Sequence, residues 1–176
     1  MSIFAAMKIL PLYAGIVLSI AFVLNAPATD WYRWRGPDLN GISKETGWQT
    51  NWPAEGPKQL WKASIGIGYA SFSVANGRAY TTGNANDTDT IFCFDVATGQ
   101  ELWKHSYPSL VGALYNEGGT SATPTVDGDR VYQFGKWGDL FCFDAANGAV
   151  IWSNNVAKEF GSAGIDDALL RSSTDE

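Results

Sequence analysis

The feature that most constrains this chain is a motif that occurs twice with the same internal spacing. Residues 92–103 read FCFDVATGQELW and residues 141–152 read FCFDAANGAVIW. At a constant offset of 49 residues the copies match Phe92 with Phe141, Cys93 with Cys142, Phe94 with Phe143, Asp95 with Asp144, Gly99 with Gly148 and Trp103 with Trp152. A chain that repeats itself at this period folds as an array of similar units.

The repeated unit extends upstream of the motif, because SVANGRAY at 73–80 resembles TVDGDRVY at 125–132. The matched pairs, at offsets of 51 or 52 residues, are Val74 with Val126, Gly77 with Gly128 and Tyr80 with Tyr132. A unit of 40 to 50 residues is typical of the blades of a β-propeller. The 19 glycines, 14% aromatic residues and 17% charged residues also favour an all-β fold over a disordered chain.

Each unit is predicted to hold four short strands. In the first unit the strands lie near residues 70–75, 78–82, 90–96 and 101–107. In the second unit they lie near residues 122–126, 130–134, 139–144 and 149–154. The pairs Asn76-Gly77 and Asp127-Gly128 indicate tight turns between the first two strands of each unit. The sequence therefore predicts an all-β fold, with about two four-stranded antiparallel blades of an incomplete propeller.

The repeated motif is interpreted as a packing device between blades. Asp95 and Asp144 are expected to accept hydrogen bonds from the backbone of the turn that follows each of them. Gly99 and Gly148 supply the positive φ that such a turn requires. Trp103 and Trp152 then stand at fixed places on the outermost strand, where a large flat ring fills the gap between one twisted sheet and the next.

The motif resembles the tryptophan-docking motif A-x-D-x-x-T-G-x-x-x-W of the pyrroloquinoline quinone (PQQ) repeat, or quinoprotein-like, β-propellers. The matching stretches are 93–103 and 142–152, with Cys93 and Cys142 in the place that is usually Ala. The resemblance covers residues 58–156 and implies a propeller fold with consecutive blades at 67–107 and 119–156.

A third tryptophan, Trp61, lies in KQLWKASIG at 58–66 with no earlier strands before it. The resemblance implies that 58–66 is a closure strand that completes a last blade absent from this chain. Residues 157–176 depart from the repeat and form a divergent tail. A propeller of this type needs about four to eight blades. The sequence is therefore expected to be the front part of a longer protein, and poorly stable by itself.

The first 28 residues are interpreted as a secretory signal. Lys8 precedes an apolar run from Ile9 to Leu24, and Ala26-Pro27-Ala28 has the form of a cleavage site. This run is shorter than the ~20 residues that span a bilayer, so cleavage is favoured over a retained anchor. We therefore expect an exported chain, periplasmic or extracellular, with no stable membrane span after cleavage. The remaining segment before the repeats, 29–57, is rich in aromatic residues.

The charge of the chain argues against nucleic acid as a partner. The sequence has 18 acidic and 12 basic residues, and removal of the leader with Lys8 changes the formal charge from −6 to −7. Such a balance repels nucleic acid and anionic lipid. The partner is expected to be an unidentified protein or small-molecule ligand.

The resemblance leaves two classes of function open. One class holds PQQ-dependent alcohol dehydrogenases, which use adjacent cysteines, a calcium ion and a catalytic Asp. The other class holds non-catalytic propellers, including scaffold proteins of bacterial envelope assembly. The chain has no adjacent cysteines. A non-catalytic binding or scaffold module is favoured, with no catalytic residue, no metal and no cofactor in this chain; PQQ and calcium are expected only in a complete propeller.

The candidate reactive residues have structural interpretations. Asn84, Asn86, Asp87 and Asp89 lack the Gly and Glu of a helix–loop–helix calcium site, so a solvated hairpin loop is favoured. His105 is the only histidine and has no nucleophile beside it. Cys93 and Cys142 are expected to be free buried thiols, because equivalent positions on successive blades lie too far apart for a disulfide.

The aromatic residues before the first blade support two interpretations. They are Trp31, Tyr32, Trp34, Trp48 and Trp52. Packing over the rim of the propeller is favoured over a ligand or partner patch, although Arg33 and Arg35 beside them suit an interface. Residues 115–120, between the two blades, are the connection where a ligand is most expected, because loops that join rigid elements carry sites.

Overall fold

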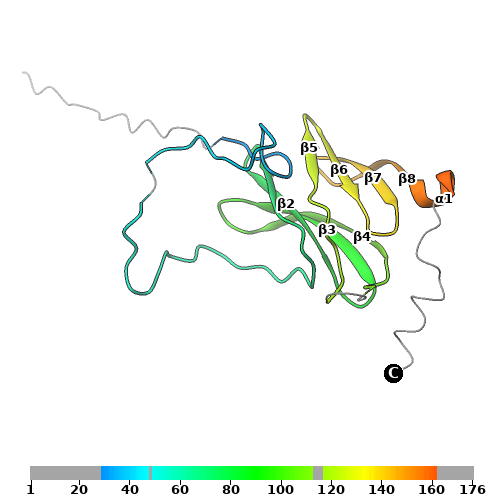
Figure 1. Cartoon of the computed structure of the whole chain (residues 1–176), viewed down its shortest axis with the longest axis horizontal. Helices are drawn as coiled ribbons and strands as arrows, with labels where there is room; N and C mark the ends of the chain where they lie inside the picture. Colours follow the sequence, from blue (N-terminus) through cyan, green and yellow to red (C-terminus); the bar gives the residue numbers. More distant parts are fainter. Residues whose placement is uncertain (1–28, 48, 113–116, 162–176) are drawn as a thin grey trace, which may run out of the picture.

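The structure, a computed structural model, describes residues 29–47, 49–112 and 117–161. The predicted leader at 1–28, Trp48, the centre of the connection between the blades and most of the predicted tail lie outside these ranges. Figure 1 shows two small sheets side by side, preceded by a long N-terminal stretch that loops away from them. Among the described residues, none forms a helix of the length and hydropathy that crossing a bilayer requires.

The first sheet, blade 1, has four antiparallel strands in the order of the sequence. They are β1 (Ser73–Ala75), β2 (Arg78–Asn84), β3 (Thr88–Asp95) and β4 (Glu101–Pro108). Blade 2 repeats this arrangement with β5 (Thr125–Asp127), β6 (Arg130–Phe134), β7 (Asp139–Asp144) and β8 (Val150–Asn155). The predicted fold class, two four-stranded antiparallel blades of a propeller, is confirmed.

The innermost strand of each blade is shorter than predicted. β1 begins at Ser73 rather than at residue 70, and β5 begins at Thr125 rather than at residue 122. The residues that lead into these strands pair with each other instead, since the Tyr69 N–H donates to the Thr120 carbonyl at 2.6 Å and the Ser71 and Thr123 hydroxyls are 2.7 Å apart. The two blades are thus joined where their inner strands begin.

The turns between the inner strands differ slightly from each other. Asn76 and Gly77 have φ of 52° and 72°, as a two-residue hairpin with a primed turn requires. In blade 2, Asp127 pairs with Arg130 in the ladder, so the loop is Gly128-Asp129 and not the predicted Asp127-Gly128. Only Gly128 of that loop has a positive φ, 58°.

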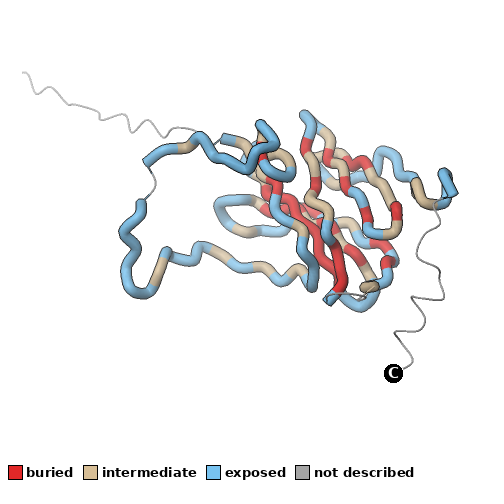
Figure 2. Tube along the Cα trace, in the orientation of Figure 1, coloured by how far each residue is buried: buried red, intermediate tan, exposed pale blue. Residues whose placement is uncertain are grey.

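The core lies within blade 1 and where the two blades meet, as the buried residues in Figure 2 show. Tyr80, Ile91 and Cys93 of blade 1 and Val131 and Phe143 of blade 2 are almost completely buried. A five-residue helix, α1 (Val156–Phe160), follows β8 directly. The sequence pattern did not predict this helix, which begins where Asn155 accepts a hydrogen bond from the Lys158 N–H at 2.9 Å.

Candidate functional site

The turn after β3 is held by Asp95. One oxygen of its carboxylate, Oδ1, accepts hydrogen bonds from the Thr98 backbone N–H at 2.8 Å and from the Thr98 hydroxyl at 2.7 Å. Gly99 closes the turn with φ of 72°, and its N–H donates to the Asp95 carbonyl at 2.8 Å. The Thr98 hydroxyl and then the Thr98 N–H hold the pKa of Asp95 below its usual range.

The turn after β7 has the same form with Asn147 in the place of Thr98. The Asp144 carboxylate accepts from the Ala146 N–H at 2.8 Å and from the Asn147 N–H at 3.3 Å. Gly148 has φ of 73° and donates to the Asp144 carbonyl at 2.9 Å. The repeated sequence therefore builds two turns that share the Asp carboxylate, the positive φ of the Gly and the bond from the Gly N–H to the Asp carbonyl.

Trp103 of blade 1 docks on the second of these turns. Its indole N–H donates to the Ala145 carbonyl at 3.1 Å, and its ring lies 5.9 Å from the Phe143 ring at 37°. A Cβ atom at Gly148 would lie only 2.6 Å from the indole. The glycine therefore serves two purposes, since it allows the positive φ and leaves room for the ring.

Trp61 docks on the first turn with nearly the same geometry. Its indole N–H donates to the Val96 carbonyl at 2.8 Å, its ring lies 5.9 Å from the Phe94 ring at 37°, and a Cβ at Gly99 would lie 2.5 Å from it. Residues 58–66, predicted as a closure strand, form no ladder with any described strand. The shared Leu-Trp-Lys sequence at 60–62 and 102–104 was the signal for this second docking contact.

Trp152 occupies the same place in blade 2 as Trp103 does in blade 1. Each pairs across the sheet with a cysteine, Cys142 for Trp152 and Cys93 for Trp103. The Trp152 ring lies 6.1 Å from Tyr132 at 50°, and the Trp103 ring lies 5.8 Å from Tyr80 at 52°. Trp103 is 8% exposed whereas Trp152 is 44% exposed, since no described turn lies against Trp152.

Both cysteines are buried as free thiols, one in each blade. Burial raises the pKa of the Cys93 thiol to about 11 and that of the neighbouring Tyr80 hydroxyl to about 12. His105 packs between blades, 5.3 Å from the Phe141 ring and 5.1 Å from the Phe143 ring, and burial lowers its pKa. The two cysteines and His105 are therefore interpreted as packing residues.

The stretch predicted as a solvated loop is partly buried, so that interpretation is wrong for Asn84 and Asp89. The Asn84 amide donates to the Asp89 carboxylate at 2.6 Å and to the Ser109 carbonyl at 2.8 Å. The Tyr107 hydroxyl donates to the same carboxylate at 3.3 Å, and burial raises the pKa of Tyr107 well above its ordinary value. The connection after β4 folds back over these residues and excludes water from them.

Asn86 and Asp87 are exposed, as predicted for that loop. Asp87 holds the connection in place, since its carboxylate accepts from the Val111 N–H at 2.9 Å and its carbonyl accepts from the Ser109 N–H at 2.8 Å. From blade 2, the Lys136 ammonium donates to the Gly112 carbonyl at 2.6 Å. The described start of the connection, residues 109–112, is thus held by side chains from both blades.

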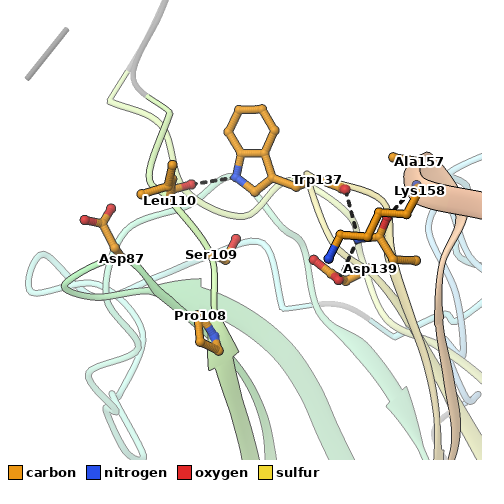
Figure 3. Close-up of a pocket in the computed structure, with 9 residues that line it drawn as sticks. Asp87, Pro108, Ser109, Leu110, Trp137, Asp139, Ala157 and Lys158 are labelled. Atoms are coloured by element: carbon orange, nitrogen blue, oxygen red, sulfur yellow. Dashed lines mark hydrogen bonds between the residues drawn. The ribbon is translucent and has the colours of Figure 1, made fainter. Parts of the chain in front are cut away.

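A cavity of about 590 Å³ opens where this connection meets blade 2, and Figure 3 shows the side chains around it. The Trp137 indole borders it and donates to the Leu110 carbonyl at 2.8 Å. The Asn155 amide bonds the Asp139 carboxylate at 2.8 Å, and Lys158 lies beside it on α1. Of the predicted ligand-binding stretch 115–120, residues 115 and 116 lie outside the described ranges and 117–120 do not line this cavity.

The aromatic residues before blade 1 separate into two groups. Trp31 pairs with Val74 of β1 through two hydrogen bonds of 2.8 and 2.9 Å, and the Tyr32 carbonyl accepts from the Val126 N–H at 2.8 Å. These two residues therefore cross the inner edges of both blades. Trp34 and Trp52 are 61% and 57% exposed, so the expected packing over the rim is wrong for them.

The arginines beside these aromatic residues stack locally. The Arg33 guanidinium lies 5.0 Å from the Tyr32 ring centroid and donates to the Pro37 carbonyl at 2.8 Å. The Arg35 guanidinium lies 5.4 Å from the Trp34 ring centroid. Arg35 and Trp34 are both exposed, so they form a small cationic and aromatic patch that a partner can reach.

Comparison with known families matches residues 87–173 to the family described as outer membrane protein assembly factor BamB. Comparison with curated proteins gave no match.

Similar solved structures include two kinds of protein. A europium-containing methanol dehydrogenase is 28% identical over 47% of this chain and 14% of its own length, with a TM-score of 0.36. The quinohemoprotein alcohol dehydrogenase ADHIIG from Pseudomonas putida HK5 is 24% identical over 54% and 14%, with a TM-score of 0.43. BamB from Moraxella catarrhalis is 22% identical over 51% and 22%, with a TM-score of 0.33.

The chain thus spans between about a seventh and about a fifth of the length of these proteins. The family match, the two antiparallel blades and the repeated docking turns agree with one another. The chain is a member of the PQQ-repeat β-propeller family.

Proposed function

We propose that the chain is an exported propeller module that binds or scaffolds another molecule and performs no chemistry of its own. The observation that carries this proposal is that the carboxylates of both blades are engaged in structural hydrogen bonds. Asp95 and Asp144 hold turns, Asp89 bonds Asn84 and Tyr107, and Asp139 bonds Asn155. Acids that are committed to structural hydrogen bonds are poor candidates for general acid or base catalysis.

The described residues do not fit the PQQ and calcium of the dehydrogenases in this family. Cys93 and Cys142 are buried in separate blades, so they cannot form the adjacent pair that the resemblance implies. No group of three or more His, Cys, Asp or Glu within the described ranges is arranged to hold a metal ion. We therefore derive no redox step for these residues, and we place PQQ and calcium only in a complete propeller.

The family match supports a scaffold function. The matched family is described as an assembly factor for outer membrane proteins, so a protein partner in the cell envelope is the favoured kind of partner for this chain. The signal-like leader at 1–28 supports export to the periplasm or beyond it. The exposed Trp34 and Arg35 are of residue types that are common in protein interfaces.

The alternative is that the chain belongs to a PQQ-dependent alcohol dehydrogenase. The full chain is incubated with PQQ, calcium ions and a primary alcohol, and dye-linked oxidation is followed with a known quinoprotein dehydrogenase as the positive control. We expect no oxidation above the rate without the chain. Turnover that a calcium chelator abolishes would overturn the proposal.

Export is tested separately by cell fractionation and mass spectrometry of the recovered chain. We expect a chain that lacks residues 1–28 in the periplasmic or secreted fraction. An intact leader on chain recovered from the cytoplasm would contradict the export part of the proposal.

A further inference from the structure

A carboxylate lies beside the backbone nitrogen that cleavage of the predicted leader exposes. The Thr29 N–H donates to Oε1 of Glu45 at 2.8 Å, across a separation of 16 positions in the sequence. Thr29 is the first residue after Ala26-Pro27-Ala28, which has the form of a cleavage site. Glu45 is therefore placed to contact the group that cleavage leaves on Thr29.

The chain between these two residues turns back tightly to bring them together. Arg35 and Leu39 have φ of 60° and 55°, a left-handed conformation that is strained for residues with a Cβ atom. The Gly41 N–H donates to the Arg35 carbonyl at 2.9 Å and closes the loop. The approach of Glu45 to Thr29 is thus built by a defined loop rather than by two extended segments that pass each other.

Residues 30–32, here called the inner strap, follow Thr29 directly and cross the inner edges of both blades. The backbone of the inner strap pairs with β1 and accepts a hydrogen bond from β5. The Asp30 carboxylate also accepts from the Asn76 N–H, at 3.3 Å for one oxygen and 3.2 Å for the other. A contact that fixes Thr29 therefore fixes the N-terminal end of a segment that touches both blades.

We infer that removal of residues 1–28 leaves an α-ammonium group on Thr29 and that the Glu45 carboxylate binds this group as an ion pair. Hydrolysis of the peptide bond before Thr29 consumes one water, and it leaves a carboxylate on the released leader and an –NH₃⁺ group on Thr29. The nitrogen already lies 2.8 Å from Glu45 Oε1, so the pair forms without rearrangement of the loop. The inference rests on the leader cleavage in the proposed function.

The ion pair strengthens a contact that the loop already makes. Before cleavage, only the acceptor of this hydrogen bond is charged, and after cleavage both donor and acceptor are charged, which makes the bond stronger. Glu45 is partly buried, so salt screens the pair less than it screens a fully exposed one. Processing of the leader is thus expected to tighten the hold of the inner strap on the blades.

The other charged groups near Thr29 have partners of their own. The Lys44 ammonium lies 2.6 Å from the Asp38 carboxylate, and the hydrogen bond to Asp38 raises the pKa of Lys44. These two residues line a cavity of about 340 Å³ together with Thr29 and Glu45. The Asp30 carboxylate is held by the β1–β2 turn. Glu45 is therefore the carboxylate to change in a test of the ion pair.

The first measurement identifies the N-terminal residue of the exported chain. The full chain is produced with its leader, and the N-terminal peptide of the recovered chain is analysed by mass spectrometry. We expect Thr29 as the first residue, and the chain that begins there is called the mature chain. A different first residue would overturn the proposed cleavage and this inference together.

The second measurement is the pKa of the α-amino group of the mature chain. It is obtained from the pH dependence of acetylation by a trace of acetic anhydride, read by mass spectrometry of the N-terminal peptide. An ordinary α-amino group has a pKa of about 7.7 to 8.0, and a carboxylate at hydrogen-bond distance raises it. At pH 7 we therefore expect acetylation about threefold slower in the mature chain than in Glu45→Gln, the effect of a partly screened ion pair.

Glu55→Gln is the matched control, because it removes an exposed carboxylate from the same N-terminal segment. Its α-amino group is expected to react as in the unchanged mature chain. Equal rates in the mature chain and in Glu45→Gln, with Thr29 confirmed as the first residue, would overturn the inference and leave the proposed export intact.

The third measurement tests whether the ion pair acts on the fold. Because the pKa of the amine is raised in the folded chain, the contribution of the pair is fully present below pH ~8 and is lost as the pH rises through the folded pKa. At pH 7 the unfolding equilibrium constant of Glu45→Gln is expected to be about threefold larger than that of the mature chain, and the ratio is expected to shrink towards pH 10. Urea unfolding followed by circular dichroism measures both constants. A ratio that stays the same from pH 7 to pH 10 would mean that Glu45 acts without the ammonium group, and would overturn the inference.

Discussion

The indole N–H of Trp103 in blade 1 donates to the backbone carbonyl of Ala145 in blade 2 at 3.1 Å. This contact joins the outermost strand of one blade to a turn of the next blade. The Ala145 carbonyl directly follows the motif Asp144, and it also accepts a hydrogen bond from the Arg78 guanidinium of blade 1. The same contact, made by Trp61 on Val96, covers the opposite side of blade 1.

Replacement of Trp103 is expected to weaken the packing between the two blades and so to destabilise the folded chain. Trp103→Ala removes a buried indole and its hydrogen bond, so we expect the free energy of unfolding to fall by about 3–5 kcal/mol. Trp103→Phe keeps much of the ring and is expected to cost less. Urea unfolding followed by circular dichroism measures both, with Trp34→Ala as the exposed control. A loss at Trp103→Ala no larger than that of the control would contradict the docking role.

Two glycines with similar backbone conformations offer a matched pair. Gly148 has φ of 73° and Gly128 has φ of 58°, so alanine at either position is strained by about 1 kcal/mol. A Cβ at Gly148 would also meet the Trp103 indole at 2.6 Å, whereas a Cβ at Gly128 would meet nothing within 4 Å. Gly148→Ala is therefore expected to lower the urea midpoint clearly more than Gly128→Ala. Equal shifts of the urea midpoint would show that the close approach of Trp103 to Gly148 does not affect stability.

The carboxylate of Asp95 is expected to contribute to the dependence of stability on pH. Its pKa is lower in the folded chain than in the unfolded chain, where it is about 3.9. The contribution is therefore fully present above pH ~4 and is lost as the pH falls through the folded pKa. Urea midpoints measured from neutral to acid pH should fall less steeply for Asp95→Asn than for the unchanged chain. Asp127→Asn, at an exposed position of β5, is the control, and the same slope in all three chains would rule out this contribution.

The thiol of Cys93 is expected to be unreactive in the folded chain. With a pKa of about 11, about one thiol in a thousand is ionised at pH 8, compared with about a quarter for an ordinary cysteine. Its burial excludes reagents as well. Ellman's reagent should therefore react slowly with the native chain and rapidly, with both cysteines, after denaturation. A rapid reaction with the native chain would mean that the blades do not protect these thiols.

The strands were predictable because their signals are local. Asn76-Gly77 specifies a tight hairpin by itself, and the Asp–Gly spacing in each motif specifies the outer turn. The limits of β6 and β7 agree with the prediction to the residue. The repeat added independent support, since a signal that occurs twice in the same register is rarely accidental.

The errors concern contacts between residues far apart in the sequence. Asn84 and Asp89 have the composition of a solvated loop, and only the return of the connection at Ser109 buries them. Trp34 resembles Trp31 in sequence context, but backbone pairing with Val74 fixes Trp31 alone. The docking of Trp61 on the first turn is also a contact between residues far apart in the sequence. The sequence showed that Trp61 resembles Trp103, but it did not show on which turn Trp61 packs.

The most direct test of the account is a double-mutant cycle that combines Trp103→Ala with Gly148→Ala. If the ring of Trp103 lies against Gly148, the Cβ that Gly148→Ala adds no longer clashes with an indole once Trp103→Ala has removed it. Gly148→Ala is therefore expected to cost no more in the Trp103→Ala chain than Gly128→Ala does in the unchanged chain, and the coupling energy is expected to be about 1 kcal/mol or more. Urea unfolding of the four chains of the cycle measures this coupling. An equal cost of Gly148→Ala in both backgrounds would mean that Trp103 does not dock on the turn of blade 2, and would contradict the central claim.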